Sequence, residues 1–231
     1  MQVRWQIAAD GWIVLALFGM VTIILGAIHA PLGTFALGLM IWMTYILRVP
    51  ARLAPANSAS IVAPADGQII AIATVPFPGA QFPGDVTNSE ATMATRITIK
   101  TGFADAHLQV VPQDGRIEEN FLIPGLFLDC GDVDAMRTDN ERREIVIETT
   151  TGDRLVIVQY GGRFARQLVC EVGTGKFVNR GTALGMIRMA GVTDIYLPTA
   201  LDLSVAVGQS TLGGETILAT TSGMTPASQM V

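Results

Sequence analysis

Few side chains in this 231-residue sequence are of the types that bind metals or transfer protons at neutral pH. The chain holds two histidines and two cysteines. Cys130 and Cys170 have neither C-x-x-C spacing nor a nearby histidine, so the sequence indicates no metal site. Two buried thiols in a reducing compartment are favoured over a single disulfide. His107 stands in a short apolar stretch, where a buried, hydrogen-bonded histidine is the default interpretation.

One acidic residue, Asp66, lies in a motif that also has an ordinary structural explanation. The sequence Pro64-Ala65-Asp66-Gly67 has the composition of a β-turn. Taken by itself, Asp66 is therefore interpreted as a turn residue, and nothing in its local sequence requires a chemical role.

The segment Gly185–Pro198 is the most specific motif of the chain. It reads Gly-Met-Ile-Arg-Met-Ala-Gly-Val-Thr-Asp-Ile-Tyr-Leu-Pro. This resembles the self-cleavage segment of phosphatidylserine decarboxylases, which usually reads G-M-I-R-F-G-S-R-V-D-V-Y-L-P. Both flanks match with no insertion between them, which fixes the register. Gly191 then stands at the position of the family's serine.

Other motifs of the same family follow in the same order, and together they span nearly the whole chain. They resemble R-D-P-x-R, S-P-A-D-G, V-H-V-N-R-x-P-x-D-G and later family motifs. In this sequence they are residues 48–52, 63–67, 106–115, 124–125, 140–142 and 162–166. The chain therefore resembles the short, pyruvoyl-dependent class of bacterial and archaeal phosphatidylserine decarboxylases.

The resemblance implies a reaction, a cofactor and a set of site residues. In the family, a serine attacks the preceding carbonyl and is converted into an N-terminal pyruvoyl group. That group forms a Schiff base with phosphatidylserine and serves as the electron sink for loss of CO₂, which gives phosphatidylethanolamine. By position, Asp66 corresponds to the orienting carboxylate, His107 to the acid/base histidine, and Gly191 to the cleavage position.

The departures from the family pattern gather at this presumed site. Gly191 has no hydroxyl, so no pyruvoyl is expected to form there. Val192 replaces an arginine, Val110 replaces an arginine or a second histidine, and Met189-Ala190 replaces Phe-Gly. We therefore expect a chain that does not cleave itself, and hence a non-catalytic, lipid-binding or regulatory homologue.

Two alternatives stay open at this point. The first is an active decarboxylase that uses another hydroxyl, such as Thr193, Ser204 or Ser210; we expect Thr193 to face away from position 191. The second is a carrier domain modified on Lys176, which lies in a Gly-Thr-Gly-Lys turn without the usual pattern of modified lysines.

The N-terminal residues have the composition of a membrane-associated helical hairpin, expected over residues 1–47. Uncharged runs cover Gly11–Ile28 and Leu32–Leu47, with a turn expected at Pro31 and Gly33. A transmembrane hairpin is predicted because about 17–25 apolar residues cross a bilayer, although a location in the interface remains open. Arginines flank both ends, which places the following domain on the cytoplasmic side of the inner membrane.

The remaining residues predict a mostly β domain. Residues 48–63 have the composition of a linker, and 64–231 are expected to form the decarboxylase-like domain. Short β-branched runs predict strands at 68–75, 95–100, 144–149, 154–159, 167–172 and 203–207. Asp132–Arg137 is expected to form a helical turn. Segments after Val172 and Val207 share a glycine pattern that resembles the hairpins of lipoyl- and biotinyl-type barrel-sandwich domains.

Charge and composition limit the partners. The net charge is −5 and the fifteen basic residues are scattered, so nucleic-acid binding is not expected. The resemblance instead implies a membrane phospholipid, phosphatidylserine, as the partner. A second copy of the chain or an active paralogue are the protein partners left open.

Overall fold

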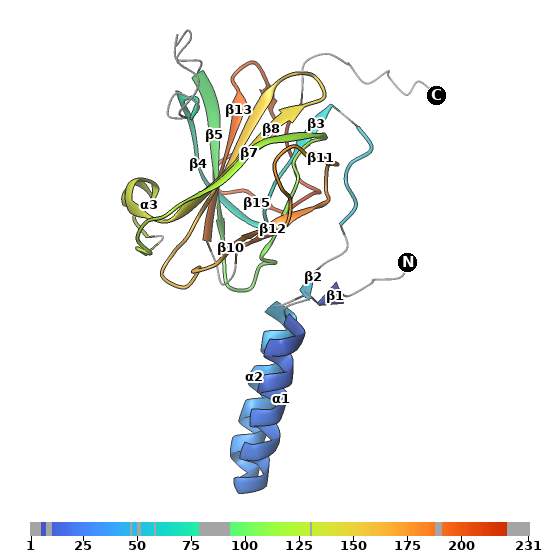
Figure 1. The fold of residues 1–231 in the computed structure, drawn as a ribbon, viewed down its shortest axis with the longest axis vertical. Helices are drawn as coiled ribbons and strands as arrows, with labels where there is room; N and C mark the ends of the chain where they lie inside the picture. The colour runs from blue at the N-terminus through green and yellow to red at the C-terminus, as the bar shows by residue number, and fades with distance from the viewer. Residues whose placement is uncertain are drawn as a thin grey trace. The chain divides into compact units, whose positions relative to one another are not determined.

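The computed structural model describes residues 6–7, 11–46, 48–49, 52–57, 59–78, 93–129, 131–187 and 191–220 (Figure 1). Contacts between Cα atoms divide the chain into two units. The first is Met1–Ala51 together with Phe103–His107, and the second is Arg52–Gly102 together with Leu108–Val231. The domain boundaries predicted from the sequence remain predictions.

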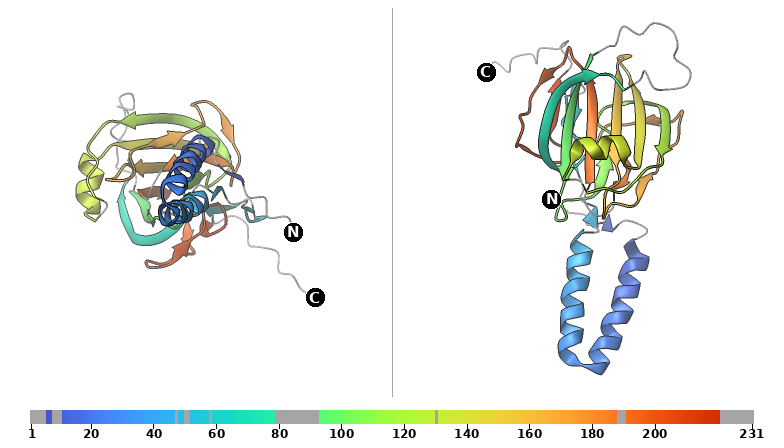
Figure 2. Two further views of the ribbon diagram at one scale, coloured as in Figure 1. Left: turned by 90° about the horizontal axis from the view of Figure 1, so that it is seen from below. Right: turned by 90° about the vertical axis from the view of Figure 1, so that its left-hand side faces the viewer.

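The first unit contains the predicted pair of helices. Helix α1 is Gly11–Ile28 and helix α2 is Ala30–Ile46, and they run side by side in opposite directions (Figure 2). The break lies at His29, two residues before Pro31 of the predicted turn, because Pro31 is tolerated in the first turn of a helix. Strands β1 (Gln6–Ile7) and β2 (Arg48–Val49) pair antiparallel beside the hairpin.

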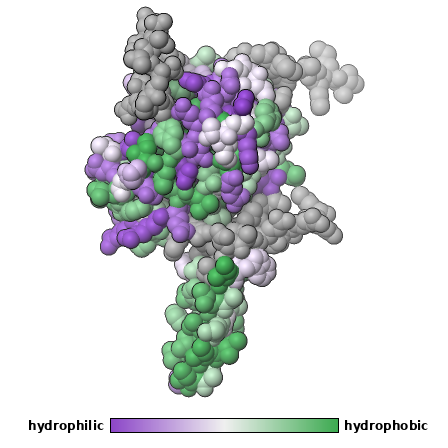
Figure 3. Space-filling model, viewed as in Figure 1, coloured by the Kyte–Doolittle hydropathy of each residue, from purple (hydrophilic) through white to green (hydrophobic). Residues whose placement is uncertain are grey.

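Two glycines let the helices approach closely. A Cβ atom on Gly33 would lie 2.5 Å from the Cα atom of Gly26, closer than any real contact. A larger residue at position 33 would therefore force the helices apart, whereas a Cβ atom on Gly26 would lie 3.7 Å from the Gly33 Cα atom, an ordinary contact. The side chains around this contact are strongly apolar and exposed: Phe35 is 75% and Ile23 74% exposed, and Figure 3 shows the described part of the hairpin as continuous hydrophobic surface.

The prediction of a transmembrane hairpin is not supported. Among the described residues, no helix is both long enough and apolar enough to cross a membrane.

The second unit is mostly β, as predicted. Its main sheet is antiparallel, has eight strands in the order β11-β7-β8-β9-β13-β5-β4-β15, and curls around a core (Figures 1 and 2). These strands are Phe177–Val178, Gly115–Ile123, Arg142–Thr149, Arg154–Tyr160, Gly191–Pro198, Met93–Thr101, Gly67–Pro76 and Ser210–Thr211. Two three-stranded sheets complete the unit: β10 (Leu168–Cys170), β12 (Ala183–Ile187) and β6 (Leu108–Val110), and β14 (Asp202–Leu203), β16 (Ile217–Thr220) and β3 (Ser60–Val62).

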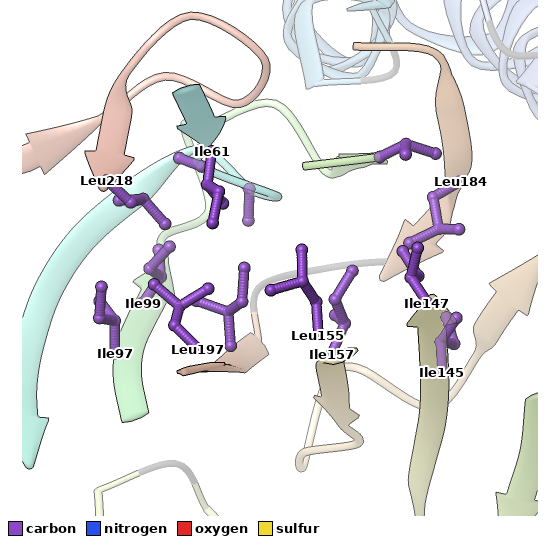
Figure 4. Packing of buried hydrophobic residues seen from close by; sticks show 14 of the residues in the cluster. Ile61, Ile97, Ile99, Ile145, Ile147, Leu155, Ile157, Leu184, Leu197 and Leu218 are labelled. Atoms are coloured by element: carbon purple, nitrogen blue, oxygen red, sulfur yellow. The ribbon is translucent and has the colours of Figure 1, made fainter. Parts of the chain in front are cut away.

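The central strand β13 separates two apolar clusters, because alternate side chains point to opposite faces. On the inner face, Ile195 and Leu197 join the main core drawn in Figure 4. On the outer face, Val192 and Tyr196 join a second cluster that also holds Met136 of helix α3 (Val133–Asp139). Strand β13 is therefore buried on both faces.

Helix α3 matches the helical turn predicted near Asp132–Arg137. The Asp132 carboxylate accepts a hydrogen bond from the Ala135 N–H at 3.1 Å and caps the helix. At the other end, Asn140 Nδ2 donates to the backbone carbonyls of Leu128 and Gly161. These hydrogen bonds fix the loop that follows the helix.

Five of the six predicted strands lie within observed strands or contain one. The sixth, Leu203–Val207, is a strand only at Asp202–Leu203, because the chain then turns at Gly208 with φ +92°. The strands β7 and β13 were not predicted as runs. In β7 the adjacent Glu118 and Glu119 interrupt the alternation of apolar and polar residues by which a strand is recognised. They lie at a bulge in the pairing with β8.

The repeat noticed in the sequence corresponds to a repeat of elements. In each copy a glycine turn, a two-residue strand, a second glycine turn and a longer strand follow one another, as β11–β12 and as β15–β16. The second turns contain Gly181 and Gly214, with φ of +77° and +80°. The N–H groups of these glycines donate to Val111 O and Ala63 O, both at 2.8 Å. The likeness to barrel-sandwich domains beyond this repeat remains a prediction.

Candidate functional site

Asp66 lies in a turn before β4, and two groups hold its carboxylate. The Gly213 N–H donates to Oδ1 at 2.7 Å, and the Arg52 guanidinium pairs with Oδ2. The residue is 7% exposed. This buried negative charge is therefore matched by a cation and by a backbone donor, which is how buried carboxylates are normally stabilised.

Gly191 is the first residue of β13 and lies close to the Asp66 turn. It pairs with Thr101 of β5, and the Thr101 hydroxyl donates to the backbone carbonyl of Asp66 at 2.7 Å. The structure thus brings two of the three predicted site residues, Asp66 and Gly191, to the same end of the β5–β13 pair.

The surroundings of Gly191 are tight. A Cβ atom built on this residue would lie 2.7 Å from Cγ2 of Ile187 and 3.5 Å from the carbonyl oxygen of Tyr160. A contact of 2.7 Å requires a shift of one partner, and Ile187 is 1% exposed and packs with Leu168 and Ala165. The fold around Gly191 is thus fitted to a residue without a side chain.

His107, the third predicted site residue, is buried, with 4% of its surface exposed. It belongs to the first contact unit and precedes β6 directly in the sequence. Its role as acid/base residue remains a prediction.

Thr193 was expected to face away from position 191, and this expectation was wrong. Residues two apart on a strand share a face, so Thr193 points to the same side as Gly191. It is fully buried, and its hydroxyl accepts a hydrogen bond from Gln109 Nε2 at 3.0 Å. Gln159 lies directly beside Thr193 on the adjacent strand β9.

The two valines that replace polar family residues are buried. Val192 is completely covered within the outer-face cluster and Val110 is 2% exposed. Met189 and Ala190 lie outside the described residues, and so does Cys130. Cys170 is partly buried, and its Sγ accepts a hydrogen bond from Asn120 Nδ2 at 3.2 Å.

A charged network on the outer face was not predicted. Asp194, which is completely buried, accepts bonds from Arg137 Nε at 2.8 Å and Nη2 at 3.3 Å, and Arg137 also donates to Thr98. The signal was present, because Asp194 interrupts an otherwise apolar strand, but only the fold shows that its partner comes from α3. Burial disfavours the charged form of Arg137, yet the Asp194 carboxylate more than offsets this and raises the Arg137 pKa.

Two tyrosines next to this network are also perturbed. Burial and the nearby Asp194 carboxylate raise the pKa of Tyr160 far above its usual value, and they raise the pKa of Tyr196 as well. Both phenols are therefore neutral, and they act as packing and hydrogen-bonding groups at physiological pH.

Lys176 is exposed in the turn between β10 and β11, next to Gly175 with φ +84°. Its backbone carbonyl accepts a bond from the Ile117 N–H at 2.9 Å, so the turn is tied to β7. Within the described part of the chain, no group of three His, Cys, Asp or Glu side chains could hold a metal ion.

Comparison with known proteins decides the family. Residues 39–219 match the family described as "Phosphatidylserine decarboxylase". The chain is 36% identical over 219 residues to a phosphatidylserine decarboxylase proenzyme of Geobacter sulfurreducens, covering 92% of this chain and 95% of the relative. The chain belongs to the phosphatidylserine decarboxylase family.

Other members give the same result. A phosphatidylserine decarboxylase proenzyme of Geotalea uraniireducens is 33% identical over 214 residues, which cover 92% of this chain and 95% of that protein. The corresponding proenzyme of Nitrobacter winogradskyi is 37% identical over 202 residues, covering 87% and 79%. These alignments cover most of the chain, and so do the family motifs found in the sequence.

Membership of the phosphatidylserine decarboxylase family gives the structural observations their context. The family uses a pyruvoyl group, and its substrate is phosphatidylserine. In this member, the strand β13 that begins at Gly191 lies in the centre of the main sheet, and the Asp66 turn lies beside its first residue.

Proposed function

We propose that this phosphatidylserine decarboxylase family member remains a single intact chain that binds phosphatidylserine without decarboxylating it. The observation that carries the proposal is Gly191. A pyruvoyl group requires a β-carbon and a side-chain oxygen in its precursor, and glycine supplies neither.

The packing at position 191 supports the same conclusion. The space that a side chain would need is occupied by Ile187, at 2.7 Å from an ideal Cβ position. Small-to-large changes in packed interiors are themselves destabilising. A side chain at position 191 therefore requires Ile187 to shift.

Two of the neighbouring side chains are apolar where the family pattern is polar, and the Asp66 carboxylate is already paired. Val192 and Val110 are buried apolar residues. The Asp66 carboxylate is engaged by Arg52 and by the Gly213 N–H, which stabilise its charged form and join the segment at residue 52 to the glycine turn. We therefore assign Asp66 a structural role in this chain.

We further propose that the helical hairpin attaches the protein to the cytoplasmic side of the inner membrane. The hairpin exposes large apolar side chains, including Trp12 at 62% and Trp42 at 49%. Surfaces of this kind associate with lipid, and tryptophan favours the interface between lipid and water. A membrane location also gives access to phosphatidylserine.

An intact-mass measurement on the full chain, purified from washed membranes, tests the proposal. We expect a single mass for 231 residues and no reactive carbonyl. Cleavage before Gly191 would give chains of 190 and 41 residues, and a shorter product carrying a borohydride-reducible carbonyl would overturn the proposal. A mass increment on Lys176 would instead identify a carrier domain. A protein that leaves the membranes in a carbonate wash would contradict attachment by the hairpin.

A further inference from the structure

Three buried polar side chains from different strands gather on the inner face of the second unit. Thr193 of β13 and Gln159 of β9 are cross-strand partners, and Gln109 of β6 donates from Nε2 to the Thr193 hydroxyl at 3.0 Å. Thr193 and Gln159 are completely covered, and Gln109 is 1% exposed. We call these three residues the amide cluster.

The amide cluster has unused hydrogen-bonding capacity. Within the described residues, both side-chain atoms of Gln159 and the Oε1 atom of Gln109 have no hydrogen-bond partner. An unpaired buried polar group costs about 1–3 kcal/mol, and most buried polar groups in proteins are paired. A side chain with two such atoms, in the middle of a sheet, is therefore expected to have a partner that the described residues do not supply.

The position of the amide cluster relates it to position 191. Gly191 and Thr193 share the inner face of β13, one side-chain repeat apart. Ile99 of β5 lies opposite Thr193, and Ile157 of β9 lies one side-chain repeat further along; both belong to the apolar core in Figure 4. The polar groups are thus confined to the end of the core where Gly191 lies.

The free atoms define the chemistry of the missing partner. Gln159 Nε2 offers two N–H donors, and the two Oε1 atoms offer acceptors. A ligand that satisfies all of them must carry both an acceptor, such as a carboxylate, and a donor, such as an ammonium group. The serine headgroup of phosphatidylserine carries both on one carbon.

We propose that the amide cluster binds the carboxylate and ammonium groups of the phosphatidylserine headgroup, Gln159 Nε2 donating to the carboxylate and the two Oε1 atoms accepting from the ammonium. This inference rests on the function proposed above and adds the residues that select the lipid. Because the three side chains are buried, the site must open before the headgroup enters. Association is therefore slower than for a preformed open site.

The test measures binding of soluble, short-chain phosphatidylserine to the intact, detergent-solubilised chain by calorimetry. We expect saturable binding, with phosphatidylglycerol, which is anionic but has no amino group, binding at least about tenfold more weakly. Equal binding of the two lipids would overturn the assignment, because it would show that charge alone is recognised.

The variant Gln159→Met separates a ligand site from a site for buried water. Methionine is similar in length and removes both unpaired atoms, so the ligand-free variant should melt at the same or a higher temperature than the parent, while phosphatidylserine affinity falls at least about tenfold. If the cluster only holds water, the variant melts lower and binds phosphatidylserine as the parent does, which would overturn the proposal.

The matched control is Gln68→Met on β4. Gln68 is exposed and its amide already donates to Gly208 O at 2.9 Å, so phosphatidylserine affinity should not change. The intact mass of every sample is measured in parallel. Self-cleavage, or an intact chain that binds no phosphatidylserine, would contradict the proposed function, whereas phosphatidylserine affinity that is unchanged in Gln159→Met would contradict only the amide-cluster assignment.

Discussion

At the scale of single residues, position 191 has no room for a side chain unless its neighbours shift. Ile187 fills the space beside the Gly191 Cα atom, and Val192 is packed among tyrosines on the other face of the strand. Because interiors are packed nearly as densely as crystals, a side chain added at position 191 requires its surroundings to move. Adding a serine hydroxyl alone is therefore not expected to make this position reactive.

The variant Gly191→Ser is expected to fold less stably than the parent, by about 1–3 kcal/mol, because its Cβ overlaps with Ile187. It is also expected to remain uncleaved. Chemical denaturation measures the first effect and intact mass the second.

The double variant Ile187→Ala/Gly191→Ser is the control for this explanation. Alanine at 187 removes Cγ2 and leaves only Cβ, which is 3.7 Å from the added atom. The cost of the serine should then shrink by about 1 kcal/mol or more in a double-mutant cycle. Strictly additive costs would show that Ile187 is not the obstacle.

At the scale of elements, α3 is held on the outer face of the sheet by Arg137 and by the burial of Met136. Arg137 pairs with Asp194 in the central strand and with Thr98 in the strand beside it. The helix has only seven residues, and so short a helix is not stable by itself. Its position thus depends on this ion pair and on the burial of Met136.

Replacing Arg137 by Met should destabilise the protein by about 3 kcal/mol, because the buried Asp194 carboxylate loses its cation. Chemical denaturation gives the value. In the control variant Asp134→Asn, the changed carboxylate is 94% exposed, and stability should hardly change. Equal losses in the two variants would contradict a specific role for the Arg137–Asp194 pair.

The elements also show what the sequence could predict. Strands with consecutive β-branched residues, such as Arg154–Tyr160, and the capped helix at Asp132 follow from local preferences. Strand β7 was missed because of its adjacent glutamates. The two hairpin helices were predicted from their apolar residues. Whether they cross a membrane does not follow from the number of apolar residues alone.

At the scale of the whole molecule, the site combines residues that the sequence could identify with residues that it could not. Asp66 and Gly191 were found through motifs, and the fold brings them together through Thr101. The amide cluster was not found. Gln109 and Gln159 are fifty residues apart, and only the meeting of two sheets shows that they flank the same threonine.

Global stability should fall in alkaline solution. Burial raises the pKa of Tyr160 above the value of about 10 for an unfolded tyrosine. Below pH 10 both states are protonated and the contribution of Tyr160 is complete; above it, only the unfolded state loses the proton, so stability decreases as pH rises. The melting temperature should therefore fall between about pH 9 and 11, and less steeply in Tyr160→Phe. Parallel curves for the two proteins would contradict this origin.

The place of β13 in the middle of the main sheet has a consequence for any scission at its first residue. The strand is hydrogen-bonded to β5 on one side and to β9 on the other, both from the chain before residue 191. A protein cleaved at this point would therefore stay assembled, because β13 of the C-terminal fragment would remain hydrogen-bonded between β5 and β9 of the N-terminal fragment. Size-exclusion chromatography would report the same particle before and after the cut, and the two fragments would separate only after denaturation.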